Sequence, residues 1–209
     1  MTDLSAIKDA LTSGDAESVK NSVQESVDRG VDADTILNDG LISGMDIVGE
    51  KMQTGEMFIP EVLMAAKSMS EAVETLKPFL KDGGRNKTGH MVIGTVKGDL
   101  HDIGKNLVTM MVESAGFEVT DLGVDVAPEK FVEAVREKNP DIVALSALLT
   151  TTMPMMQQTV DALAESGVRD QIKIIVGGAP VTQEFADRIG ADGYASDASG
   201  ASKLAKSLG

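Results

Sequence analysis

The feature that most constrains the fold is a change in hydrophobic periodicity near residue 85. Throughout residues 1–80 apolar side chains recur at helical spacing, as Leu41, Met45 and Val48 do. Beyond this point, short apolar runs alternate with segments of helical spacing, which is the pattern of parallel strands joined by crossover helices. We therefore expect a helical N-terminal region followed by an α/β domain.

The N-terminal region is predicted to be a four-helix bundle over residues 1–85. Pro60 suits the first turn of a helix that continues through Leu63 and Met69 towards Leu76. Connections as short as "DRGVDAD" are typical of such bundles. The stretch "KPFLKDGGRNKTG" combines a proline, paired glycines and mixed charge, and it predicts the linker between the two domains.

The second domain, residues 88–209, is predicted to be a Rossmann-like (flavodoxin-like) α/β domain with a five-stranded parallel sheet. The expected strands are "MVIGTV", "FEVTDLG", "DIVALSALL", "IKIIVGG" and "DGYAS". Helices are expected to begin near Ile103, Pro128, Pro154, Val181 and Ala198. Because ligands of such sheets bind beyond the carboxyl ends of the strands, the loops at those ends are the candidate site.

Composition excludes several classes of function. The 19 Lys and Arg residues against 33 Asp and Glu give a net charge of −14, which repels phosphate backbones, so no nucleic acid is expected as a partner. The chain has no cysteine, which excludes disulfides, thiolate metal sites and cysteine nucleophiles. Neither a signal peptide nor a membrane-length apolar run is present. We therefore expect a soluble cytoplasmic protein that has no membrane partner.

One glycine-rich loop stands out at the end of the first expected strand. The sequence "GTVKGDLHDIGKNLV" contains His101, one of only two histidines in the chain. The simplest interpretation is a polar surface loop in which Asp99 or Asp102 caps the next helix. Phosphate binding is disfavoured, because Gly98 and Gly104 enclose five residues rather than the four of a P-loop.

A metal site made only of protein ligands is also disfavoured. The other histidine, His90, begins the same expected strand and lies too far along it to join His101. A metal held in a macrocycle needs a single protein ligand, and an imidazole oriented by a carboxylate can supply it. Asp99, two residues before His101, can turn towards the ring nitrogen that does not bind the metal.

The pattern of this loop and two later elements carries a family resemblance. "DLHDIG" resembles the Asp-x-His-x-x-Gly signature of cobalamin-binding domains of the methionine synthase and methylotrophic corrinoid-protein type. "SAL", at 146–148, and the pair Gly177-Gly178 follow in the family's order and spacing. "GEMFIPEVLMAAKSM", at 55–69, resembles the helical cap of the same proteins. The whole chain is thus similar to small corrinoid proteins that partner substrate-specific methyltransferases.

The resemblance implies a cobalamin (corrinoid) cofactor, carried as methylcobalamin and bound with its own base off cobalt and a histidine on it. His101 would be the lower cobalt ligand, and Asp99 would accept a hydrogen bond from its other ring nitrogen. Gly104, Gly177 and Gly178 would let the nucleotide tail pass close to the backbone. Ser146 would bind the displaced base, whose pocket Leu148 would help to line. The remaining cofactor contacts that the resemblance implies are Gly98, Leu100, Asp102, Ile103 and Thr150.

Two positions have an alternative interpretation. The family's relay from aspartate and histidine to a serine would fall here on Thr152, which could instead cap the helix that begins near Pro154. Phe58 would cover the corrin from the helical cap, or it would be ordinary bundle core on the same face as Val62.

The function that the resemblance implies is methyl carriage rather than stand-alone catalysis. The partners would be a substrate-specific corrinoid methyltransferase, a second methyltransferase directed to tetrahydrofolate or to a thiol, and a reductive activase. One alternative is the small cobalamin-binding subunit of a mutase, which the "MFIP" cap segment disfavours. Another is a cobalamin-dependent sensor, for which no DNA-binding module is visible. The methyl donor is not encoded in any feature of the sequence.

Overall fold

The computed structural model describes residues 3–80 and 88–209 and divides into two compact units, one helical and one α/β. Most of the expected linker, residues 81–87, lies outside the described residues. Its first part is not a linker, because Lys77–Phe79 form a 3-10 helix that continues the last helix of the first unit. Among the described residues, none of the helices combines the length and the apolar character needed to cross a membrane.

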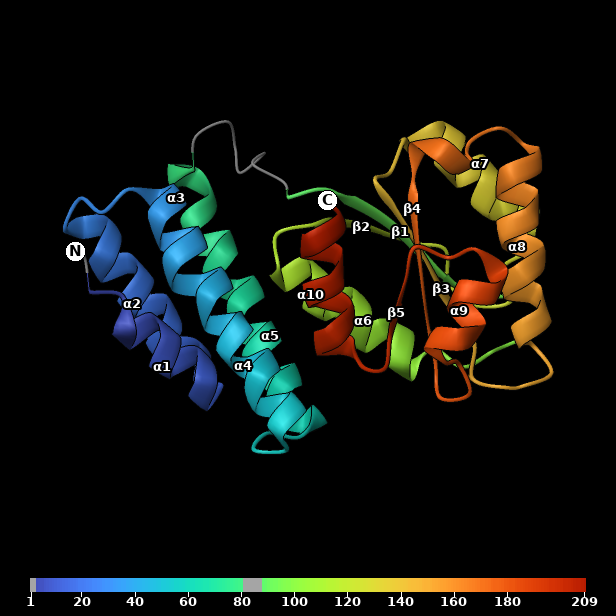
Figure 1. Cartoon of the computed structure of the whole chain (residues 1–209). Coiled ribbons are helices and arrows are strands. Elements are labelled where there is room, and N and C mark those ends of the chain that lie inside the picture. Colours follow the sequence, from blue (N-terminus) through green and yellow to red (C-terminus); the bar gives the residue numbers. More distant parts are fainter. Residues whose placement is uncertain (1–2, 81–87) are drawn as a thin grey trace. The chain divides into compact units, whose positions relative to one another are not determined.

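Over residues 3–80 the helical unit is a bundle of four helices, coloured from blue to green in Figure 1. The elements are α1 (Ser5–Ser13), α2 (Ala16–Asp28), a third helix made of α3 (Ala33–Thr35), η1 (Ile36–Ile42) and α4 (Ser43–Thr54), and α5 (Ile59–Leu76). Asp15 caps α2 by accepting a hydrogen bond from the Ser18 amide, 3.1 Å away. Gly14 and Gly55 end α1 and α4 in the left-handed conformation.

The middle of the third helix is a π-helix, which the sequence pattern did not predict. Ile36 and Leu41 are both fully buried, although they are five positions apart. The wider π turn brings residues at that spacing onto one face, whereas an α-helix would rotate one of them away from the core. Leu11 of α1 lies so close to Gly44 that a Cβ there would be 2.7 Å from its Cδ1.

The α/β unit contains a five-stranded parallel sheet in the order β2-β1-β3-β4-β5. Its elements are β1 (His90–Thr95), α6 (Ile103–Ser114), β2 (Glu118–Asp121), α7 (Pro128–Lys138), β3 (Ile142–Ser146), α8 (Met153–Glu165), η4 (Arg169–Gln171), β4 (Lys173–Gly177), α9 (Gln183–Ile189), β5 (Gly193–Ala195) and α10 (Ala198–Leu208). Helices α6 and α10 cover one face of the sheet, and α7, α8 and α9 cover the other (Figure 1). The predicted fold class, a flavodoxin-like sheet after a helical bundle, is confirmed.

Several expected element boundaries differ from the observed ones, most clearly at the end of the third strand and at the start of α9. The third strand, predicted over residues 141–149, ends at Ser146, because the amides of Leu148 and Leu149 bind the Asp99 side chain instead of a neighbouring strand. Helix α9 begins at Gln183 rather than near Val181.

The strand register shows which residues lie side by side at the carboxyl edge of the sheet. Thr95 of β1 lies opposite Ser146 of β3, which in turn lies opposite Gly177 of β4. The loops that follow these three residues therefore begin side by side. In a sheet of this order the connections that follow β1 and β3 lead to opposite faces of the sheet, and ligands of such folds bind where these connections separate.

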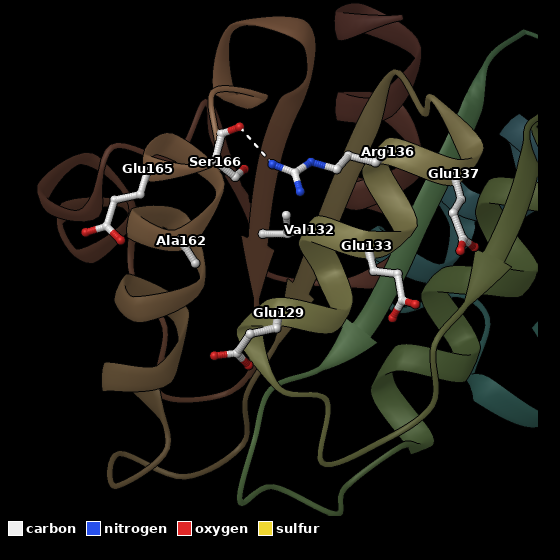
Figure 2. A pocket seen from close by; sticks show the side chains of 8 residues that line it. All are labelled: Glu129, Val132, Glu133, Arg136, Glu137, Ala162, Glu165 and Ser166. Atoms are coloured by element: carbon white, nitrogen blue, oxygen red, sulfur yellow. Dashed lines mark hydrogen bonds between the residues drawn. The ribbon is translucent and has the colours of Figure 1, made fainter.

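The described part of the unit also has a groove between α7 and α8, with a volume of about 690 Å³. Figure 2 shows Arg136 reaching across it to the Ser166 carbonyl oxygen, to which its Nη2 donates a hydrogen bond of 3.2 Å. The groove is lined by Glu129, Val132, Glu133, Arg136, Glu137, Ala162, Glu165 and Ser166. None of these residues belongs to the loops after β1, β3 or β4.

Candidate functional site

The loop between β1 and α6 brings Asp99 and His101 together at the carboxyl edge of the sheet. The Asp99 Oδ1 atom lies 2.7 Å from His101 Nδ1 and also accepts a hydrogen bond of 3.1 Å from the His101 amide. Because an ionised carboxylate can only accept, a neutral imidazole in this contact carries its proton on Nδ1. The His101 side chain is 51% exposed, whereas the Asp99 side chain is completely buried. Nε2 is therefore the nitrogen with a lone pair available to a ligand.

The second carboxylate oxygen of Asp99 connects this loop to the loop after β3. Asp99 Oδ2 accepts hydrogen bonds from the Thr152 hydroxyl at 2.7 Å and from the Leu148 amide at 2.8 Å. Burial alone would raise the Asp99 pKa, but the hydrogen bonds from Thr152, Leu148 and His101 outweigh it and hold the pKa well below its ordinary value. Asp99 is thus a buried carboxylate that stays charged and orients the imidazole.

Thr152 had two alternative interpretations, a contact with Asp99 or a cap of α8, and its hydrogen bonds distinguish them. It occupies the N-cap position of α8, but its side chain makes no capping hydrogen bond to that helix. Its hydroxyl instead donates to Asp99 Oδ2 and is also 2.9 Å from the Leu149 carbonyl oxygen. The structure therefore brings the Asp99, His101 and Thr152 side chains into one chain of contacts.

Apolar side chains lie exposed on the same loops. Leu100 is 71% exposed and Ile103 is 78% exposed, and Leu148 and Leu149 are each about two-fifths exposed. Thr150 is exposed as well, whereas Ser146 is half-buried at the end of β3. A cluster of uncovered apolar side chains around a half-exposed histidine is typical of a surface that a large, mainly apolar ligand covers.

The three glycines expected to lie beside the nucleotide tail differ in the space that a Cβ atom would have. Gly104, at the start of α6, is exposed, and a Cβ there would meet no atom within 4 Å. Gly178 has φ +132° and a Cβ there would overlap the Ala147 carbonyl oxygen. The chain's own packing therefore already requires glycine at Gly178. Gly177 is intermediate, because its Cβ would be 3.0 Å from the Ala195 carbonyl oxygen.

The remaining predicted loop residues hold the loop itself. Gly98 has φ +81°, and its amide donates to the Asp125 Oδ1 atom at 2.7 Å. Asp102 contacts the first turn of α6 through Asn106. Its main-chain oxygen accepts the Asn106 amide at 2.7 Å, and its carboxylate accepts the Asn106 side chain at 3.2 Å.

Two polar residues of this region were missed in the sequence. Lys105, whose side chain is only 2% exposed, makes an ion pair with Asp121 at the end of β2. Asp125 follows the same strand and binds the Gly98 amide. The signal that could have found both is the sheet order, because in a 2-1-3 arrangement the end of β2 lies beside the end of β1.

Phe58 does not belong to the bundle core. It precedes α5, its amide donates to the Glu61 carboxylate at 2.8 Å, and its side chain is 68% exposed, whereas Val62 is fully buried. The interpretation of Phe58 as core was therefore wrong. Ile59 and Met64 on the same helix are also about half exposed.

A single imidazole is the site's only evident metal ligand. Within residues 3–80 and 88–209, no group of three or more His, Asp or Glu side chains is placed to hold an ion. The donor set therefore fits a metal that a macrocycle already coordinates, for which one oriented nitrogen is enough. The exposed apolar side chains and the open space at Gly104 fit a bulky organic group better than a bare ion.

Comparison with known proteins agrees with this chemistry. Residues 89–202 match a family model described as a B12 binding domain, and residues 4–77 match a second B12 binding domain model. The chain belongs to the family of cobalamin-binding corrinoid proteins. Its expected cofactor, a corrinoid, is thereby confirmed.

Individual relatives extend over nearly the whole chain. A dimethylamine corrinoid protein of Methanosarcina acetivorans is 46% identical over 193 residues, which are 90% of this chain and 91% of that protein. A solved cobalamin-binding protein of Desulfitobacterium hafniense has a TM-score of 0.87 and 36% identity over 99% of this chain and 98% of that one. A chain of the methanol:cobalamin methyltransferase complex of Methanosarcina barkeri has a TM-score of 0.85 and 32% identity, covering 98% of this chain and 78% of that chain.

Proposed function

We propose that the protein carries methyl groups between two methyltransferases on a corrinoid that His101 holds by its Nε2 atom. The observation that supports this most directly is the half-exposed imidazole, whose Nδ1 is engaged by the buried Asp99. A bound corrinoid supplies the cobalt that accepts and releases the methyl group. The protein's own part is to hold the imidazole in one tautomer, to cover apolar edges of the cofactor and to exclude water.

Each residue of the site has a distinct task in this proposal. Asp99 keeps the proton on Nδ1, and Thr152 and the Leu148 amide keep Asp99 ionised and fixed. Leu100 and Ile103 supply apolar contact surface. Ser146 and Leu148 bind the displaced base of the cofactor, and Gly104 and Gly177 admit its nucleotide tail. Phe58, exposed at the start of α5, covers the reactive face and shields it from water.

The partners follow from the same proposal. One known relative is named for dimethylamine, and another is part of a complex named for methanol. A carrier of this type therefore works with partners of different substrate specificity. We propose a substrate:corrinoid methyltransferase as the methyl source, a second methyltransferase as the recipient, and a reductive activase that restores the reduced cofactor. Pull-down of the corrinoid-loaded protein from its own host, followed by identification of the captured methyltransferase, tests which enzyme supplies the methyl group.

Binding of hydroxocobalamin tests the central proposal. The purified chain is expected to bind it one to one, with its dimethylbenzimidazole off cobalt and His101 on. After reduction to cobalt(II), electron paramagnetic resonance of protein made with isotopically labelled histidine should show hyperfine coupling that changes with the label. Coupling that instead follows a label in dimethylbenzimidazole would contradict the proposal. Since His90 is labelled too, loss of the signal in His101→Ala assigns it to one residue.

Gly104→Ala separates contact with the cofactor from packing within the chain. The apo-protein should be as stable as the parent or more stable by about 0.5 kcal/mol, because alanine is favoured over glycine in a helix and the site is open. Affinity for hydroxocobalamin should fall about tenfold, since a methyl group forced into filled space costs roughly 1–3 kcal/mol. Urea unfolding and equilibrium binding measure the two effects.

Gly178→Ala is the contrasting variant. Its Cβ would overlap the Ala147 carbonyl oxygen, so it should lose stability whether or not the corrinoid is present. If Gly104→Ala bound the corrinoid as tightly as the parent, the tail would not pass at this position.

A further inference from the structure

Asp125, in the loop between β2 and α7, forms two hydrogen bonds with the main chain of Gly98 and Asp99. Its Oδ1 atom accepts a hydrogen bond of 2.7 Å from the Gly98 amide. Its own amide donates one of 3.0 Å to the Asp99 carbonyl oxygen. Side chain and main chain of one residue thus bind two consecutive residues of the His101 loop. The neighbouring Val126 amide ties the same segment to the Thr95 carbonyl oxygen at 3.0 Å.

The backbone of Asp125 has the unusual φ of +54°. In the described residues, Asn139 is the other non-glycine residue with a positive φ, and it lies at the end of α7, where left-handed residues commonly end helices. Asp125 ends no helix. A conformation of this kind persists where the surroundings fix it, and here the two hydrogen bonds to Gly98 and Asp99 do so.

We propose that Asp125 is a positioning residue for the histidine ligand, an inference that rests on the proposed role of His101. Thr152 and the Leu148 amide hold the Asp99 carboxylate, and the Asp99 amide donates to the Val96 carbonyl oxygen at 3.1 Å within the same loop. Asp125 adds a restraint from outside the loop, because it ties Gly98 and the Asp99 carbonyl oxygen to the segment after β2, so that Asp99 meets His101 Nδ1 in a single arrangement. An imidazole oriented before binding loses less freedom when the cofactor arrives, which strengthens binding.

Two substitutions separate the side chain from the backbone conformation. Asp125→Gly removes the acceptor for Gly98, while glycine adopts a positive φ without strain. Asp125→Asn retains an Oδ1 acceptor and tolerates the left-handed conformation, so it should rescue the effect.

Matched controls lie elsewhere in the same unit. Asp197→Gly removes a carboxylate that likewise accepts a glycine amide, Gly200, at 2.8 Å, but at the start of α10. Asn139→Gly relieves the other positive φ without touching the His101 loop.

The first readout uses the apo-protein. Nuclear magnetic resonance of Asp125→Gly should show the Gly98 amide proton moved upfield and exchanging faster. The resonance of the His101 Nδ1 proton, which is hydrogen-bonded to Asp99 in the parent, should broaden.

The second readout is hydroxocobalamin binding. The dissociation constant should rise about tenfold in Asp125→Gly, which is the lower end of the 10–100-fold loss of affinity that follows when a residue supporting a metal ligand is removed. In Asp125→Asn it should return close to the parent value.

The outcomes are distinct. An unchanged Nδ1 proton together with parental affinity in Asp125→Gly would overturn the positioning role, and so would an equal loss of affinity in Asp197→Gly or Asn139→Gly. If the parent protein bound no corrinoid while the apo spectra of Asp125→Gly changed as expected, the proposed function would fail, and the restraint of Asp99 and His101 by Asp125 would stand.

Discussion

Replacement of His101 by alanine is expected to remove the lower nitrogen ligand of the bound corrinoid while leaving the fold intact. The side chain is 51% exposed and its ring makes one hydrogen bond, to the ionised Asp99, so the apo-protein should lose about 1.5–3 kcal/mol of stability. Affinity for hydroxocobalamin should fall by at least about tenfold, since even partners behind a metal ligand contribute 10–100-fold. Absorption spectra of the loaded variant should show a corrinoid without a nitrogen ligand from the protein.

The second histidine provides the control for this experiment. His90→Gln replaces a ring whose Nε2 contacts the Thr120 hydroxyl at 2.8 Å, at the opposite end of β1 from the site. Its spectrum and affinity should match the parent. If His101→Ala also matched the parent in both measurements, the imidazole would not be on the cobalt.

Asp99→Asn is expected to have the largest effect on stability. An amide has one acceptor oxygen, so it cannot accept from His101 Nδ1 on one side and from the Thr152 hydroxyl and Leu148 amide on the other. A buried donor left without a partner costs about 1–3 kcal/mol, and the variant should lose at least about 2 kcal/mol at neutral pH by urea unfolding. Corrinoid affinity should fall as the imidazole loses its fixed tautomer.

The same carboxylate makes the stability of the parent depend on pH in a defined direction. Because folding lowers the Asp99 pKa from its ordinary value of 3.8, its contribution is fully present above that pH. It is lost as the pH falls towards the lower pKa of the folded state. Asp99→Asn should therefore flatten the acid limb of the stability profile. Asp161→Asn, which changes an exposed carboxylate that accepts from Gln157, should not do so. An acid limb that is unchanged in Asp99→Asn would contradict the assignment.

Hydrophobic spacing predicted most of the architecture, because strands buried on both faces and amphipathic helices leave strong local signals. Helices α6, α7 and α10 begin at the residues near which they were expected, Ile103, Pro128 and Ala198. The π-helix at Ile36–Ile42 was not, since apolar residues five apart in a helical segment look like an ordinary helix with one misplaced residue. The end of β3 was missed because a distant carboxylate, not the local sequence, takes the amides of Leu148 and Leu149.

Part of the candidate site could also be predicted from the sequence, because some of its contacts leave local signals. Asp99 and His101 are two residues apart, so their contact follows from local geometry, and Thr152 was found through a family pattern. Asp125 and Lys105 were not found, because their contacts exist only once β2 lies beside β1. Sequence gives no local sign that an aspartate after one strand binds a glycine after another.

The hydrogen bond between Thr152 and Asp99 joins residues 53 positions apart, which follow the carboxyl ends of the paired strands β1 and β3. Closing a loop of that length carries an entropic cost that a nascent or partly folded chain has not yet met. The imidazole is consequently not oriented until β3 has docked and the start of α8 has formed. Under the proposed function, the site that binds the cofactor tightly is complete only in the folded domain, so the amount of corrinoid bound tightly would report the yield of correctly folded protein rather than the amount of polypeptide made.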